Sequence, residues 1–68
     1  MELSARNNLK ARVKNIKLGE VAAEVILDVG GQEMCSTITV DSVKRLGLKV
    51  GDEVVAVIKA SSVMIGKP

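Results

Sequence analysis

Hydrophobic and polar residues alternate with a period of two along most of the chain, which is typical of strands that have one buried and one solvated face. The alternation is clear over Leu9–Lys14, Val21–Val29 and Glu33–Val40. The segment Glu53–Lys59 is apolar on both faces, which indicates a strand buried inside an assembly or a closed barrel. A short apolar run, Val63–Ile65, predicts a fifth and last strand.

The connections between these strands carry recognisable turn and helix signals. Gly30 and Gly31 predict a tight hairpin, because glycine tolerates the positive φ that such turns require. The segment Asp41–Leu46 has apolar residues at helical spacing, and we expect Asp41 to be its N-cap and Gly47 to end it. One short helix therefore separates the third strand from the fourth.

This order of elements predicts an all-β fold, a five-stranded Greek-key barrel of the OB type with one short helix between strands 3 and 4. The expected domain is single and spans residues 1–68. Closing the sheet into a barrel would hide the edges of its valine-rich strands, which otherwise favour aggregation. A simple antiparallel sandwich is the alternative.

Composition indicates that the chain associates with copies of itself. Hydrophobic residues make up 47% of its 68 residues, yet Phe, Tyr and Trp are absent. Domains of this size bury only about 60% of their unfolded surface and usually need disulfides, a metal or association. A single cysteine and no histidine leave association as the remaining means of stabilisation. We therefore expect a homo-oligomer.

The charge pattern does not predict a nucleic-acid or membrane protein. The net charge is only +2, and Lys10, Arg12 and Lys14 are interpreted as the wet face of a strand. Aromatic residues that would stack on bases are absent. No apolar run approaches the roughly 18 residues of a membrane span. Met1–Lys10 lacks the apolar core of a secretory signal, and Cys35 is a free thiol, so we expect a cytoplasmic protein.

Enzyme chemistry is poorly supported by the sequence. Histidine is absent, so the usual acid–base group near pH 7 is missing. Cys35 has no histidine partner and lies in a predicted strand, where it is interpreted as a small, semi-buried hydrophobic residue. The carboxylates are scattered and form no metal-binding loop. We therefore predict that the chain is not an enzyme and holds no metal cation directly.

Groups suited to a small oxyanion are better represented. Ser4 and Arg6 share a face in an extended segment, and Thr39 precedes the predicted helix. Lys59 is followed by Ala60–Ser62, which offers hydroxyl and N–H donors. Oxyanions bind to such sets of amides, hydroxyls and cations. From the residues alone, the favoured alternative is a disordered N-terminal segment and a Thr39 that only caps the helix.

Three stretches of the chain resemble the molbindins, a family of small bacterial molybdate-binding proteins. They are Ser4–Asn7, Ile38–Ser42 followed by Leu46–Leu48, and Val57–Ile65, in the order and at the spacing of the family. The resemblance extends over Ser4–Ile65, which is nearly the whole chain. The same module occurs in a molybdate-sensing regulator and in molybdate transporters.

The resemblance implies an OB-like barrel that assembles as a hexamer, a trimer of dimers, with strands exchanged between subunits. It implies molybdate or tungstate as the ligand, held at subunit interfaces without an organic cofactor, for storage, buffering or homeostasis of molybdenum. The residues implied to contact the oxyanion are Ser4, Ala5, Arg6, Thr39, Lys59, Ala60 and Ser61. A nucleic-acid-binding OB module, an accessory domain of a molybdate transporter and a ligand-free structural oligomer are the alternatives.

Overall fold

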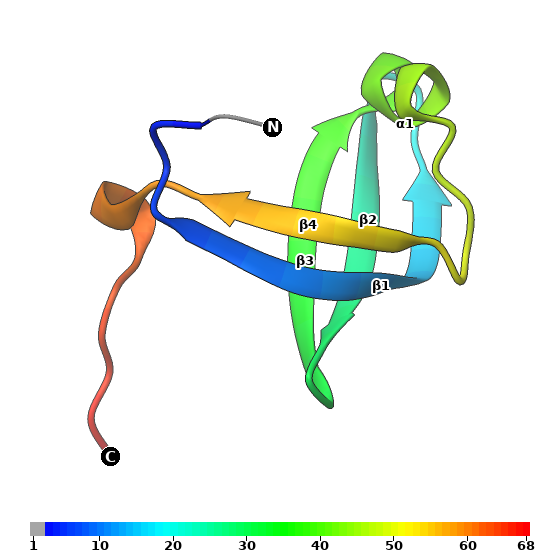
Figure 1. Cartoon of the computed structure of the whole chain (residues 1–68). Helices are drawn as coiled ribbons and strands as arrows, with labels where there is room; N and C mark the ends of the chain where they lie inside the picture. Colours follow the sequence, from blue (N-terminus) through cyan, green and yellow to red (C-terminus); the bar gives the residue numbers. More distant parts are fainter. Residues whose placement is uncertain (1–2) are drawn as a thin grey trace.

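Four antiparallel strands form one sheet in the order β3-β2-β1-β4 in a computed structural model, which describes residues 3–68 (Figure 1). The elements along the chain are β1 (Asn7–Leu18), β2 (Ala22–Val29), β3 (Gln32–Thr39), α1 (Val40–Leu46), β4 (Glu53–Ile58) and the 3₁₀ turn η1 (Ala60–Ser62). Met1 and Glu2, the first two residues of the predicted domain, lie outside the described residues. The predicted strand–helix order through Ile58 is confirmed.

A β-bulge interrupts β1 at Lys14, within its pairing with β2. Val13 pairs with Leu27, and Ile16 pairs with Val25, with a register shift between them at Lys14. The extra residue reverses the phase of the strand, so that Val13 and Ile16 both contact the core although they are three positions apart. Figure 1 shows β1 running beside β4 and then bending to run beside β2. The bulge explains why the period-two pattern stops at Lys14 although the strand continues.

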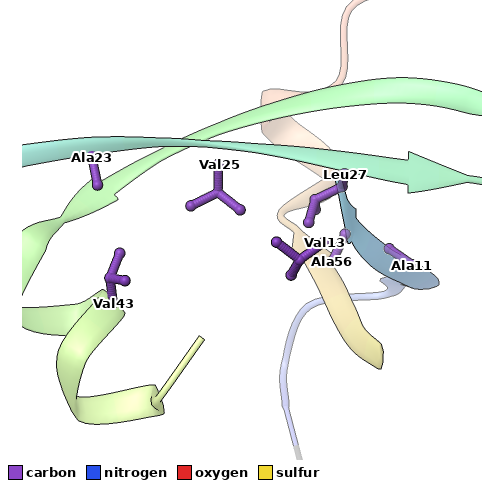
Figure 2. Close-up of a cluster of buried hydrophobic side chains, with 7 residues drawn as sticks. All are labelled: Ala11, Val13, Ala23, Val25, Leu27, Val43 and Ala56. Carbon is purple, nitrogen blue, oxygen red and sulfur yellow. The ribbon is translucent and has the colours of Figure 1, made fainter. Parts of the chain in front are cut away.

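The core is built from small aliphatic side chains that the alternation placed on the inner faces (Figure 2). Val13 is the largest fully buried side chain. The sheet supplies most of the core, and Val43 of α1 covers one end of it. The buried residues are Ala11, Val13, Ala23, Val25, Leu27, Val43 and Ala56.

The β2–β3 hairpin has the predicted glycine turn. Gly30 and Gly31 adopt φ angles of 58° and 89°, in the region that favours glycine. The Asp28 carboxylate accepts a hydrogen bond from the Gly31 N–H at 2.8 Å, which closes the turn. β2 and β3 are therefore held in register from Val29–Gln32 to Ala22–Thr39.

Helix α1 begins one residue earlier than predicted, and its N-cap is Thr39 rather than Asp41. Thr39 has extended backbone angles, and its Oγ1 accepts the Ser42 N–H at 3.0 Å. The prediction of Asp41 was wrong because the helix follows β3 directly, which places Asp41 inside the first turn. Its negative charge is favourable there, beside the positive end of the helix dipole. Gly47 ends the helix as predicted, with φ 63°.

The predicted fifth strand and the closed barrel are not found in residues 3–68. Beyond β4 the chain enters η1, and Val63–Ile65 continues without strand pairing. Met64 and Ile65 are 93% and 94% exposed. The reason is physical: η1 directs the segment away from the sheet (Figure 1), where it meets no strand that could complete its backbone hydrogen bonds. One open sheet with β3 and β4 at its edges replaces the predicted barrel, and also the alternative sandwich.

The open sheet leaves an apolar groove along its inner face, with a volume of about 570 Å³. Met34 and Ile38 of β3 line one side, and Val54 and Ile58 of β4 line the other. Among the described residues, no helix is long and apolar enough to span a membrane.

Candidate anion-binding site

The pairing of β1 with β4 brings the two ends of the predicted site together. The β1–β4 ladder ends at the pair Asn7 and Ile58, so Arg6 and Lys59 both leave the sheet at that point. Figure 1 shows the start of β1 and the turn η1 at the same end of this strand pair. Six of the seven predicted residues belong to these two segments: Ser4, Ala5, Arg6, Lys59, Ala60 and Ser61. Two cations are therefore neighbours, although 53 positions of the sequence separate them.

The turn η1 leaves donors open next to Lys59. Within the turn, the Ser62 N–H donates to the Lys59 carbonyl at 2.9 Å, and the Val63 N–H donates to the Ala60 carbonyl at 3.2 Å. The N–H groups of Ala60 and Ser61 have no acceptor among residues 3–68. Since the first N–H groups of a helical turn lack partners within it, these two donors are available to a ligand.

The N-terminal segment is exposed at the same strand end. Ser4 and Arg6 are exposed, and Ala5 is half-buried. The Asn8 side chain donates a hydrogen bond from Nδ2 to the Ala5 carbonyl at 3.3 Å. Asn8 had no predicted role in the site. Its only sequence signal is an Asn three positions after Ala5, a residue type that hydrogen-bonds to nearby backbone.

The structure does not bring Thr39 to the other predicted residues. Thr39 pairs with Ala22 at the far end of β2 and β3, and a 12-residue strand separates that end of the sheet from Arg6. Its hydroxyl is already engaged, because Oγ1 accepts from the Ser42 N–H and donates to Ser42 Oγ at 2.8 Å. Thr39 therefore caps α1 in the single chain. A single chain therefore holds the candidate donors in two places, with Thr39 at one end of the sheet and the other six residues at the other end.

The larger hollows of the surface lie elsewhere. A groove of about 640 Å³ runs along β1 and β4, where the carboxylates of Asp28 and Glu53 offset the charges of the cations Lys10 and Arg12. The apolar groove inside the sheet offers little to a charged ligand. None of the predicted site residues lines either hollow. The candidate donors are therefore on the open surface of the chain.

The cations of β1 are interrupted by carboxylates from β4 and β3. Arg12 lies 3.6 Å from Glu53, and Lys14 forms an ion pair and hydrogen bond with Glu33. The hydrogen bond to the Glu33 carboxylate, together with its charge, raises the pKa of Lys14 above the ordinary value. This face is thus not a continuous basic stripe of the kind that binds nucleic acid. Residues 3–68 also contain no cluster of acidic, Cys or His side chains suited to a metal ion.

The chain matches a known domain family and resembles proteins named for molybdenum or molybdate. Residues 3–65 match the TOBE domain. The chain is 50% identical over 66 residues to molybdenum-pterin-binding protein 1 of Clostridium pasteurianum. The matched region covers 96% of this chain and 97% of that relative. The structure superposes with a TM-score of 0.95 on a molybdate-binding protein of Sporomusa ovata, at 43% identity, covering 98% of this chain and all of the other.

A second solved structure, the cytoplasmic molybdate-binding protein ModG, matches with a TM-score of 0.94 and 51% identity over the whole of this chain, which spans 49% of the ModG chain. These relatives are binding proteins, in agreement with the prediction that the chain is not an enzyme. The resemblance to molbindins is confirmed by the molybdate-binding proteins among the structural neighbours. Since the match extends over residues 3–65, the chain belongs to the TOBE domain family.

Proposed function

We propose that this chain binds molybdate non-covalently between the subunits of a cytoplasmic homo-oligomer, and that it stores or buffers the oxyanion. The observation that carries the proposal is the convergence of Arg6 and Lys59 at one end of the β1–β4 pair, where open N–H groups lie beside them. Molybdate binding by the related proteins of Sporomusa ovata and by ModG supports this choice of ligand. The description of ModG as cytoplasmic supports the location.

The chemistry of the two segments fits a tetrahedral dianion. Arg6 and Lys59 would offset its two negative charges, while Ser4, Ser61 and the Ala60 N–H would fix the positions of its oxygens. Hydrogen bonds to charged groups contribute about 1.5–3 kcal/mol each. Sulfate has the same charge and shape, so discrimination rests on the size of the pocket. Tungstate is nearly the size of molybdate, and we propose that it binds as well.

The placement of Thr39 supports a site shared between subunits. Thr39 lies at the other end of the sheet from Arg6, so a pocket that uses both takes Thr39 from a second copy. The open sheet edges and the exposed apolar residues Met64 and Ile65 provide surface for that association. We propose that Val63–Ile65 pairs with a neighbouring subunit as an exchanged strand, in a hexamer built as a trimer of dimers. Within residues 3–68 of one chain, the residues proposed to bind the anion line neither of the two grooves.

We propose that the inorganic anion is the ligand and that no organic cofactor is needed. The Clostridium pasteurianum relative is named for a molybdenum–pterin. A planar pterin ring would be held best by stacking on an aromatic side chain, and this chain has none. Molybdate alone should therefore bind to protein that was unfolded, stripped of small molecules and refolded.

The test is isothermal titration of the purified protein with molybdate, tungstate, sulfate and phosphate. Arg6→Ala and Lys59→Ala should each weaken molybdate binding about tenfold or more, because each removes a charged hydrogen-bonding partner. Lys10→Ala is the matched control, since Lys10 is an exposed cation in the middle of the β1–β4 ladder, away from the ends of the sheet that hold Arg6 and Thr39. Unchanged affinity in both site variants would refute the assigned site, and the absence of heat with any oxyanion would refute the proposed function.

A further inference from the structure

The segment that carries Ser4 and Arg6 lies outside the sheet and is tied to it by one side chain. The β1–β4 ladder begins at Asn7, so Leu3–Arg6 makes no ladder contact. Within residues 3–68, the one hydrogen bond to this segment is the 3.3 Å contact from Asn8 Nδ2 to the Ala5 carbonyl. The backbone of Asn8 is anchored, because Asn8 pairs with Val57 in the ladder.

The carbonyl that accepts this hydrogen bond lies between the two residues proposed to bind the anion, so restraining it affects the orientation of both. Ala5 lies between Ser4 and Arg6 in the chain. The peptide unit is planar, so holding the Ala5 carbonyl also fixes the direction of the Arg6 N–H and limits the directions in which the Arg6 side chain leaves the backbone. An unrestrained segment would lose this freedom only when the ligand binds, and that ordering would weaken the affinity.

We infer that Asn8 is a positioning residue of the anion-binding site, which orders Ser4–Arg6 before the ligand arrives and does not itself contact the ligand. The inference rests on the proposed function and assigns to it a residue outside the set that the family resemblance implied. The contact is exposed and slightly long. Its expected effect is accordingly modest, and we expect Asn8→Ala to weaken molybdate binding about two- to tenfold.

The experiment compares the wild type, Asn8→Ala and Asn15→Ala. Asn15 is the matched control, because it is an exposed asparagine of the same strand whose side chain accepts only from the neighbouring Ile16 N–H. Molybdate affinity is measured by titration calorimetry. Backbone ¹⁵N order parameters of Ser4–Arg6 are measured in the ligand-free protein, since they report fast local motion.

Weaker binding together with lower order parameters for Ser4–Arg6 in Asn8→Ala alone is the expected result. Unchanged affinity in Asn8→Ala would overturn the inference and leave the proposed function intact. Weaker binding with unchanged order parameters would also overturn it, because Asn8 would then act by direct contact. A wild type that binds no molybdate would refute the proposed function instead, and the order parameters would still show whether Asn8 restrains the segment.

Discussion

At the scale of single residues, Lys14 links the bulge of β1 to the edge strand β3. Its ammonium group donates a hydrogen bond to the Glu33 carboxylate. This hydrogen bond, together with the charge of Glu33, raises the pKa of Lys14 above its usual 10.5, with a smaller contribution from Asp28. Because the folded-state pKa is raised, the contact is fully present below pH 10.5 and is lost as pH rises through the higher value. The ¹³Cε shift of Lys14 should therefore titrate at a higher pH in the wild type than in Glu33→Gln. Equal midpoints would show that the ion pair does not persist in solution.

Only some parts of the candidate site were predictable from the sequence, and residue type decided which. The hydroxyl, amide and cationic donors were recognisable from residue type and from the family resemblance. Their meeting depends on the register Asn7–Ile58, which is a contact between distant parts of the chain that no local pattern encodes. Asn8 was missed because a single asparagine near a strand has many ordinary roles.

At the scale of elements, the end of α1 depends on Gly47. Its φ of 63° lies in the left-handed region, where its N–H reaches the carbonyls of Val43 and Lys44. A β-carbon there is unfavourable, so Gly47→Ala should lower the free energy of unfolding by about 1–2 kcal/mol. Denaturant unfolding measures the change, and Lys44→Ala on the exposed face of the same helix should change it by less than about 0.5 kcal/mol. Similar values for the two variants would contradict the assigned cap.

The elements also show where sequence patterns are informative. The bounds of β2 and β3 were predicted to within one residue, because alternation maps directly onto a regular pleat. The second half of β1 was missed, because the bulge at Lys14 reverses the phase of the pattern. The run Val63–Ile65 has strand-like composition, but a strand also requires a partner, and composition does not say which chain supplies it.

At the scale of the whole molecule, the proposed function connects ligand binding to assembly. A ligand that binds only the folded oligomer stabilises it by mass action, by about 2.7 kcal/mol at a hundredfold excess over the dissociation constant. We therefore expect saturating molybdate to raise the melting temperature, and the rise should depend on protein concentration. Sulfate at the same ionic strength is the control. A melting curve that molybdate leaves unchanged would argue against sites between subunits.

The aliphatic core has a further consequence for how this molecule can be observed. Without Trp, Tyr or Phe, and with a core of Ala, Val and Leu side chains (Figure 2), the polypeptide carries no chromophore for near-ultraviolet light. Any absorbance or emission of the purified protein in that range must come from something bound to it, so a co-purified pterin would be visible without a protein background. A single fluorophore introduced by Leu3→Trp, next to Ser4, would report on the anion-binding segment alone.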